Sequence, residues 1–227
     1  MSGLKLLPTH DKMNYDRIYE YRFKGVDQAK KLSTWKIIAE FIYEKLGKPA
    51  SILDPAAGNC EFINQVPAGE RWAVDMNAQT QKAAANNVKV IIGNNLTANL
   101  PVNYFDAVYI SNFLEHLHTQ EEVAGFLERM YGVLKPGGKI CIMGPNFKYC
   151  AKQYFDFADH TVILSELGVA EHLYGAGFYI NEVHPKFLPL SFRSKIPVTD
   201  FLVKMYLKLP FAWNFMGKQF LIIAQKQ

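Results

Sequence analysis

The chain has few cysteines and no long apolar segment, and both absences exclude classes of protein. Its three cysteines, Cys60, Cys141 and Cys150, are odd in number and include no closely spaced pair. They therefore fit neither a disulfide framework nor a zinc ribbon, and we expect no metal site and a cytoplasmic location. No run approaches the roughly 20 apolar residues of a membrane-spanning helix. Residues 1–12 also lack the continuous apolar stretch of an export signal.

Charge blocks, internal repeats and low-complexity tracts are also missing from the sequence. The formal charge of +4 is spread over 227 residues without a cluster of Lys and Arg, so nucleic acid is not indicated as a partner. The apolar share of 49% is ample for one large core, and the length suits a single α/β domain with appendages. Nothing in the sequence specifies the oligomeric state.

Apolar runs of strand length alternate with segments of helical periodicity from about residue 33 to residue 143. This alternation predicts right-handed crossovers and a parallel sheet. The helices are expected to have clear ends, with Gly47 and Pro49 closing the first and a capping box of Thr119 and Glu122 opening the fourth. The predicted strands are 51–54, 71–75, 88–92, 105–111, 139–143, 178–183 and 219–224, and the predicted helices are 33–46, 58–65, 78–86, 119–134 and 165–174.

Two acids mark the ends of the first two predicted strands. Asp54 precedes the small residues Ala56, Ala57 and Gly58, and Asp75 follows 21 positions after Asp54. That separation is close to the spacing of about 20 at which a ribose-binding acid sits in an open α/β sheet. The pattern predicts an adenosine-like ligand in a crevice at the carboxyl ends of the strands.

Four motifs in order resemble those of the class I S-adenosylmethionine-dependent methyltransferases: residues 54–60, 74–77, 105–117 and 133–139. The resemblance implies a Rossmann-like, doubly wound, mostly parallel sheet of seven strands in the order 3-2-1-4-5-7-6, with the last strand antiparallel and helices on both faces. It also implies S-adenosylmethionine as the cofactor. In this reading Asp54 accepts from the methionine ammonium, Asp75 takes both ribose hydroxyls, and Met76 faces the adenine. The full set of expected cofactor contacts is Asp54, Ala56, Ala57, Gly58, Asp75, Met76, Asn94, Asn95, Ser111, Asn112 and Phe113.

The first motif departs from the family pattern because Ala56 and Cys60 stand where glycine is usual. A positive φ at Ala56 would be costly. The same departure argues against a dinucleotide-dependent dehydrogenase, which requires G-x-G-x-x-G directly after the strand. A DNA amino-methyltransferase is disfavoured as well, because the fourth strand ends in Ser111-Asn112-Phe113-Leu114 instead of an Asn/Asp-Pro-Pro-aromatic motif that grips a flipped base.

Segments 144–149, 154–160 and 187–189 resemble methyltransferases associated with bacterial surface-polysaccharide or glycolipid synthesis. This resemblance implies an acceptor region with aromatic faces for a sugar, built around Asp159 and His160. If a hydroxyl is methylated it must lose a proton, and His116 and His160 are the candidate catalytic bases. Ordinary roles stay open: Asp54 as a helix cap, the pair Asn94 and Asn95 as a turn, His116 as a packed side chain, and the aromatic segment as a cover for the sheet.

We therefore expect one methyltransferase domain with an N-terminal arm or lid (1–32), a cofactor-binding core (33–143) and an acceptor-side cover (144–227). The predicted function is methyl transfer to a small-molecule or saccharide acceptor, and the alternative is a non-catalytic S-adenosylmethionine-binding or scaffolding protein. The basic, aliphatic stretch 192–213 either packs on the sheet or makes a weak contact with a membrane surface.

Overall fold

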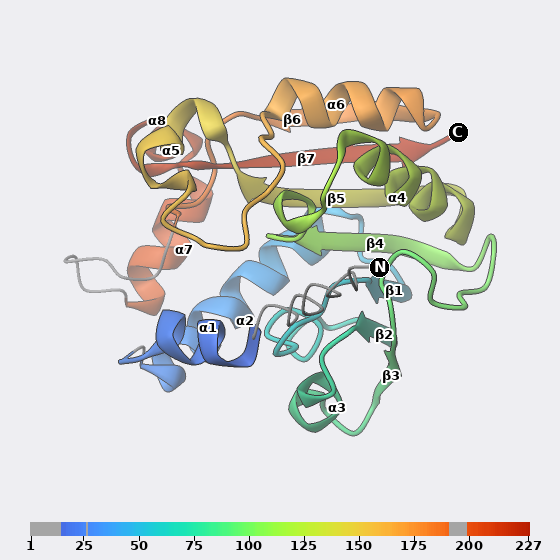
Figure 1. The fold of residues 1–227 in the computed structure, drawn as a ribbon, viewed down its shortest axis with the longest axis horizontal. Helices are drawn as coiled ribbons and strands as arrows, with labels where there is room; N and C mark the ends of the chain where they lie inside the picture. Colours follow the sequence, from blue (N-terminus) through green and yellow to red (C-terminus); the bar gives the residue numbers. More distant parts are fainter. Residues whose placement is uncertain (1–14, 26, 191–198) are drawn as a thin grey trace, which may run out of the picture.

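Seven strands form one mixed sheet in the computed structural model, which describes residues 15–25, 27–190 and 199–227 (Figure 1). The strand order is β3-β2-β1-β4-β5-β7-β6, and β7 runs antiparallel to both of its neighbours. The predicted fold class is confirmed. The strands are β1 (Ser51–Asp54), β2 (Glu70–Asp75), β3 (Val88–Ile92), β4 (Phe105–Ser111), β5 (Leu134–Pro145), β6 (Phe178–His184) and β7 (Gln219–Lys226).

Helices cover both faces of this sheet and divide the core into two layers. Alternate residues of β5 face opposite layers, with Ile140 and Ile142 packed under α4 and α6, and Cys141 and Met143 packed under α2, α7 and α8. This alternation follows from the two-residue period of a strand. The helices are α1 (Tyr15–Phe23), α2 (Gln28–Lys45), α3 (Gln79–Ala83), α4 (Gln120–Val133), α5 (Phe147–Tyr154), α6 (Glu166–Gly175), α7 (Asp200–Lys208) and α8 (Pro210–Met216), with a short 3₁₀ helix η1 (Leu114–His116).

The capping signals place the helix ends close to the predicted positions. The Thr119 hydroxyl accepts the N–H of Glu122 at 3.1 Å, while the Glu122 carboxylate accepts the N–H of His118 at 2.7 Å. The two side chains thus satisfy free N–H groups at the start of α4, as a capping box does. Helix α2 begins earlier than expected, because Asp27 caps it through the N–H of Lys30.

Two predicted helices differ in the structure. Residues 58–65 form consecutive turns and no α-helix, because Gly58 and Cys60 both have a positive φ that interrupts helical geometry. The helix predicted over 78–86 is shortened to α3. Asn64 ends it by accepting from the N–H of Ala85 and donating to the carbonyl of Ala83, both at 2.8 Å.

The last part of the chain completes the sheet with β6 and β7, as expected, and adds α7 and α8 in the stretch that carries the prolines. The first part of the predicted basic segment, residues 192–198, lies outside the described residues. Among the residues that the structure describes, no helix is both long and apolar enough to cross a membrane.

Candidate active site

Asp54 and Asp75 lie at the carboxyl ends of the adjacent parallel strands β1 and β2. The Asp75 carboxylate accepts the N–H groups of Gly58 at 2.7 Å and Asn77 at 2.8 Å. The Asp54 carboxylate accepts the N–H of Ala56 at 3.2 Å. The structure thus brings the two acids and the turn that follows β1 together at one edge of the sheet, which is where open α/β folds bind nucleosides.

Burial dominates the electrostatics of Asp54. Its side chain is almost inaccessible, with 4% exposure, and desolvation raises its pKa to about 8. The negative charges of Asp75 and Glu61 raise the pKa further, against the lowering effect of the Ala56 N–H. A ligand cation at this position would favour the ionised carboxylate, so Asp54 suits an ammonium group.

The turn itself is built around two left-handed residues. Gly58 has φ +50° and Cys60 has φ +60°, whereas Ala56 does not have a positive φ. The backbone strain that the sequence suggested at Ala56 is therefore found at Cys60 instead. A Cβ on Gly58 would meet nothing within 4 Å, so its backbone conformation, and not crowding, is the reason for glycine there.

Two side chains hold this turn in place from a distance. The buried Asn95 donates its Nδ2 to the carbonyl of Pro55 at 2.6 Å, and the buried Thr80 donates its Oγ1 to the carbonyl of Gly58 at 2.7 Å. Asn95 was expected to contact the cofactor, and in the structure its amide supports the turn. Thr80 was not singled out in the sequence, because no local pattern reveals a contact across 22 residues.

The other expected cofactor residues border the same edge. Met76 is exposed just past β2, and the side-chain oxygen of Asn94 accepts the N–H of Leu96 at 2.8 Å in a turn. At the end of β4, Asn112 has φ +49° and donates its N–H to the carbonyl of Met143 at 2.9 Å. Ser111 accepts from the Asn112 amide at 3.0 Å, while the Phe113 ring packs on Phe126 in the core.

A second cluster joins η1 to the segment after α5. The Nδ1 of His116 lies 2.9 Å from the Asp159 carbonyl and 3.5 Å from the Asp159 carboxylate, and the rings of His116 and His160 are 5.1 Å apart. The carbonyl of Glu115 accepts the N–H of Thr161 at 2.8 Å. The structure therefore brings together the two histidines that the sequence proposed as bases. If Nδ1 carries the proton, Nε2 of His116 is the basic nitrogen.

The pKa values of Asp159 and His160, the acid and the more buried base of this cluster, are both lowered, but for different physical reasons. Desolvation, together with a smaller effect of the neighbouring His116, lowers the pKa of His160 to about 4. Its Nδ1 is buried and has no hydrogen-bond partner among the described residues. Burial alone would raise the pKa of Asp159, but its hydrogen bond with Arg22 and the nearby His116 outweigh burial and lower it.

Arg22 brings the N-terminal helix α1 into this cluster. Its guanidinium forms an ion pair with the buried Asp159 carboxylate and lies 5.0 Å above the centre of the Phe157 ring. Phe157 stacks in turn on His160, with ring centres 4.8 Å apart. No sequence signal singled out Arg22 for this contact, which spans 137 positions.

Glu115, His116 and His160 are also a potential ligand set for a metal ion. Each offers one ligand atom, and these atoms lie within 4.8 Å of one another. Ligands of a tetrahedral zinc ion are only about 3.4 Å apart, so the side chains would have to close around a cation. No metal site was expected from the sequence. If a metal ion is required at this cluster, treatment with a chelator should abolish methyl transfer, and if none is required, activity should be unchanged.

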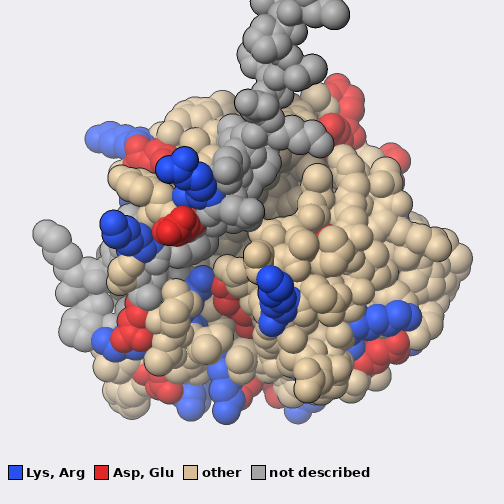
Figure 2. All heavy atoms as spheres, turned by 60° about the horizontal axis from the view of Figure 1, so that its bottom comes forward, with Lys and Arg blue, Asp and Glu red and all other residues tan. Residues whose placement is uncertain are grey.

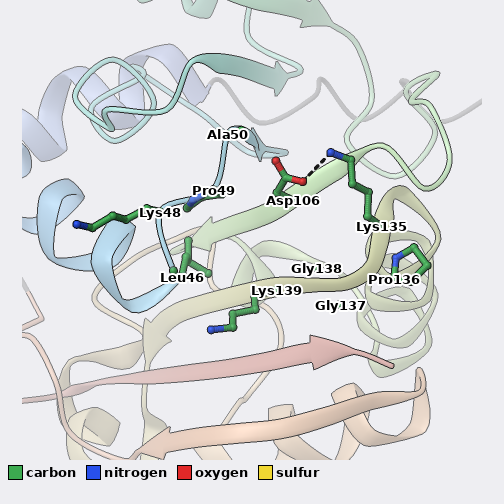
Figure 3. Close-up of a pocket in the computed structure, with 11 residues that line it drawn as sticks. Leu46, Lys48, Pro49, Ala50, Asp106, Lys135, Pro136, Gly137, Gly138 and Lys139 are labelled. Atoms are coloured by element: carbon green, nitrogen blue, oxygen red, sulfur yellow. Dashed lines mark hydrogen bonds and ion pairs between the residues drawn. The ribbon is translucent and has the colours of Figure 1, made fainter.

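One cavity of about 340 Å³ lies at the opposite, amino-terminal edge of the parallel strands (Figure 3). In it, Lys135 points toward Asp106 and donates to its carboxylate at 2.6 Å, and Lys48 and Lys139 also line the space. Cofactors of open α/β sheets bind at the carboxyl ends of the strands, so this cavity is on the wrong side for the nucleoside.

Charged side chains of both signs are interspersed on the face seen in Figure 2. Lys and Arg gather mainly on the left of this view, where Asp and Glu lie among them. A protein that binds the phosphate backbone of nucleic acid typically presents a continuous basic surface. The described part of this face has no such surface.

Residues 53–142 match the family model described as a methyltransferase domain. Among curated protein sequences, none matches the chain. The chain is similar to a SAM-dependent methyltransferase from Archaeoglobus fulgidus, with a TM-score of 0.64 and 21% identity over 94% of this chain and 100% of the other. It is also similar to a possible histamine N-methyltransferase from Thermotoga maritima, with a TM-score of 0.64 and 15% identity over 93% and 99% of the two chains. A third similar structure is the cyclase SpnF, with a TM-score of 0.58 and 14% identity over 84% and 80%.

At these identities the solved structures establish the fold that the chain shares with them. The family match adds the chemical class, because the matched segment contains β1 to β4 and the turn between Asp54 and Asp75. The chain is an enzyme of the methyltransferase class, and its cofactor is S-adenosylmethionine.

Proposed function

We propose that the enzyme methylates a hydroxyl group of a small-molecule or saccharide acceptor. The observation that carries this proposal is the placement of Asp54 and Asp75 on neighbouring strands, joined through the turn at Gly58. Asp75 has two acceptor oxygens for a ribose diol, and Asp54 has a buried carboxylate for an ammonium group. S-adenosylmethionine, when bound, supplies the activated methyl group. The remaining contacts that we assign to it are Ala56, Ala57, Gly58, Met76, Asn94, Asn95, Ser111, Asn112 and Phe113.

We assign the proton-accepting role in this reaction to His116. Its Nδ1 faces the carbonyl and the carboxylate of Asp159, which favours the tautomer in which Nε2, 3.9 Å from the Glu115 carboxylate, carries no proton. His160, with its lowered pKa, stays neutral near pH 7, and we assign it a hydrogen bond to the acceptor through its buried Nδ1, which has no partner among the described residues. Catalysis then depends mainly on orientation, because methyl transfer is an in-line displacement.

Aromatic side chains around this cluster support a sugar acceptor. Phe155 is exposed directly after α5, and its ring centre lies 5.3 Å from that of Tyr154, which in turn lies 4.8 Å from that of His160. Exposed ring faces next to a polar cluster are suited to the alternating apolar and hydroxyl faces of a pyranose. On this basis we place the enzyme in the synthesis of a surface polysaccharide or glycolipid.

Calorimetry with S-adenosylhomocysteine tests the cofactor site. The variant Asp75→Ala should bind about 100-fold more weakly than the wild type, because hydrogen bonds to a charged group contribute roughly 1.5–3 kcal/mol each. The control is Asp200→Ala, which removes an exposed acid from α7 and should leave affinity unchanged. Equal affinity of the wild type and Asp75→Ala would refute the assigned site.

The similarity to a cyclase favours examining a second candidate, a protein that binds the cofactor without transferring its methyl group. The two are separated by following S-adenosylhomocysteine formation with polysaccharide and lipid extracts as acceptors. Product formation that requires an extract supports the transferase. Tight cofactor binding without product in any extract supports the second candidate.

A further inference from the structure

Two short helices near the C-terminus carry large apolar side chains on their exposed side. Phe201 on α7 is 70% exposed, and Phe211 and Phe215 on α8 are each 74% exposed. Soluble monomers seldom gather so many exposed large apolar residues in one place. We call the set the apolar patch, and its members are Phe201, Leu202, Met205, Leu209, Phe211, Phe215 and Met216.

The inner side of the same helices is firmly packed, so the exposure of the patch does not reflect loose helices. Leu207 and Trp213 are buried, and the Trp213 ring lies against Phe187 with ring centres 4.9 Å apart. The indole N–H of Trp213 donates to the carbonyl of Tyr206 at 2.8 Å. The Phe211 and Phe215 rings contact each other at 4.9 Å. The patch is thus a preformed feature of the surface.

Helix α7 has the pattern of a helix that lies in a membrane interface. At about 100° per residue, Phe201, Met205, Leu209 and Leu202 fall within one arc of its surface. Lys204 and Lys208 follow one border of this arc and are exposed. Apolar side chains flanked by lysines suit a surface of acyl chains beneath anionic headgroups.

The charge of the surrounding sequence is complementary to such a surface. Residues 185–227 contain seven of the 25 Lys and Arg residues but only one of the 21 Asp and Glu residues, Asp200. That segment therefore carries a net charge of +6, whereas residues 1–184 carry −2. One of these positive charges, that of Lys226, is buried and does not contribute to the surface. A juxtaposed anionic leaflet attracts Lys and Arg by roughly 1 kcal/mol each.

We propose that the apolar patch is an interfacial membrane-binding surface that inserts into the headgroup region of an anionic bilayer. Helices α7 and α8 are too short to cross a bilayer, and Pro210 separates them, so the contact is peripheral. Neither the fold nor the cofactor site requires these exposed aromatic residues. Figure 1 places α7 and α8 at the same end of the sheet as α1 and α5, which lets an enzyme docked in this way remain next to its acceptor region.

Vesicle flotation of the full chain tests this proposal. The protein should float with vesicles of phosphatidylcholine and phosphatidylglycerol, and much less with phosphatidylcholine alone. The variant Phe211→Ser/Phe215→Ser should lose about tenfold or more in affinity, because two exposed aromatic side chains no longer insert. The matched control is Tyr174→Ser/Tyr179→Ser, which removes two exposed rings from α6 and β6 and should bind as the wild type does.

The charged border is tested separately with Lys204→Gln/Lys208→Gln, which should weaken binding to anionic vesicles and reduce its sensitivity to salt. Absence of wild-type flotation, or flotation that neither double variant weakens, would overturn the proposal. A dimer in light scattering that Phe211→Ser/Phe215→Ser converts to a monomer, without vesicle binding, would instead make the patch a subunit interface and also overturn it.

Discussion

Cys60 combines full burial with a left-handed backbone, and this makes its stability effect testable. Its φ is +60° and its Sγ lies 3.7 Å from the carbonyl of Thr80. A Cβ in this conformation costs roughly 1 kcal/mol, which glycine avoids. We predict that Cys60→Gly unfolds at a higher denaturant concentration than Cys60→Ala, with a free energy of unfolding about 1 kcal/mol larger.

The control for this comparison is Ala39→Gly in the middle of α2, where glycine should cost about 1 kcal/mol in the usual way. Glycine in place of alanine should therefore raise the free energy of unfolding at position 60 and lower it at position 39. If alanine is better than glycine at position 60 as well, the strain at Cys60 has been overestimated.

Predictability of individual site residues depended on how far their partners lie along the chain. Asp54, Asp75 and Gly58 are part of a local strand-and-turn pattern, and each could be singled out from the sequence. Asn95 and Arg22 reach their partners across 40 and 137 positions, so the contacts they make depend on the completed sheet. Local patterns carry no information about such pairings.

At the scale of elements, strands were predictable and some helices were not. β3 and β4 begin and end at the predicted residues, because both are rich in the apolar and β-branched residues that favour strands. The apolar periodicity of residues 58–65 is equally clear, but two positive φ values convert that segment into turns. In the same region, the Asn64 side chain truncates α3, a tertiary contact that overrides the favourable helix propensity of alanine.

Helix α1 is held over the proposed acceptor region by the ion pair of Arg22 with Asp159. Loss of this pair leaves the buried Asp159 carboxylate without its strongest partner. The carboxylate and the carbonyl of Asp159, which orient His116, are then held less firmly. We predict that Arg22→Gln lowers kcat by about 10- to 100-fold, corresponding to a charged hydrogen bond, with little change in cofactor affinity. Methyl-transfer kinetics and calorimetry measure the two effects.

The matched control is Lys24→Gln, which removes the same charge from an exposed residue next to α1 and should be silent. A second readout is rescue by the conservative variant Arg22→Lys, which restores a cation beside Asp159 and should recover part of the lost kcat. Parallel losses of kcat and cofactor affinity in Arg22→Gln would indicate a general disturbance of the fold and not a positioning role.

For the molecule as a whole, the two edges of the sheet have different characters. The amino edge holds an open cavity with an exposed ion pair, whereas the carboxyl edge holds buried ionisable groups that are not fully compensated. Keeping ionisable groups buried in their uncharged forms costs stability, and the concentration of such groups at one edge is typical of a functional site.

The burial of these ionisable groups makes the free energy of unfolding depend on pH in a defined direction. The pKa of Asp54 is about 8 in the folded protein and near 3.8 when unfolded, so folding takes up a proton and stability falls as pH rises from about 4 to 8. His160 has the opposite sign, but its contribution is complete above its ordinary pKa of 6.5. Between pH 6.5 and 8 the free energy of unfolding of the wild type should therefore fall by up to about 2 kcal/mol, whereas that of Asp54→Asn should not show this fall. Urea unfolding at the two pH values measures the difference.

The same variant should bind S-adenosylhomocysteine more weakly, because a neutral amide at this position cannot balance an ammonium charge. Identical pH dependence in the two proteins would mean that Asp54 is already ionised in the folded state.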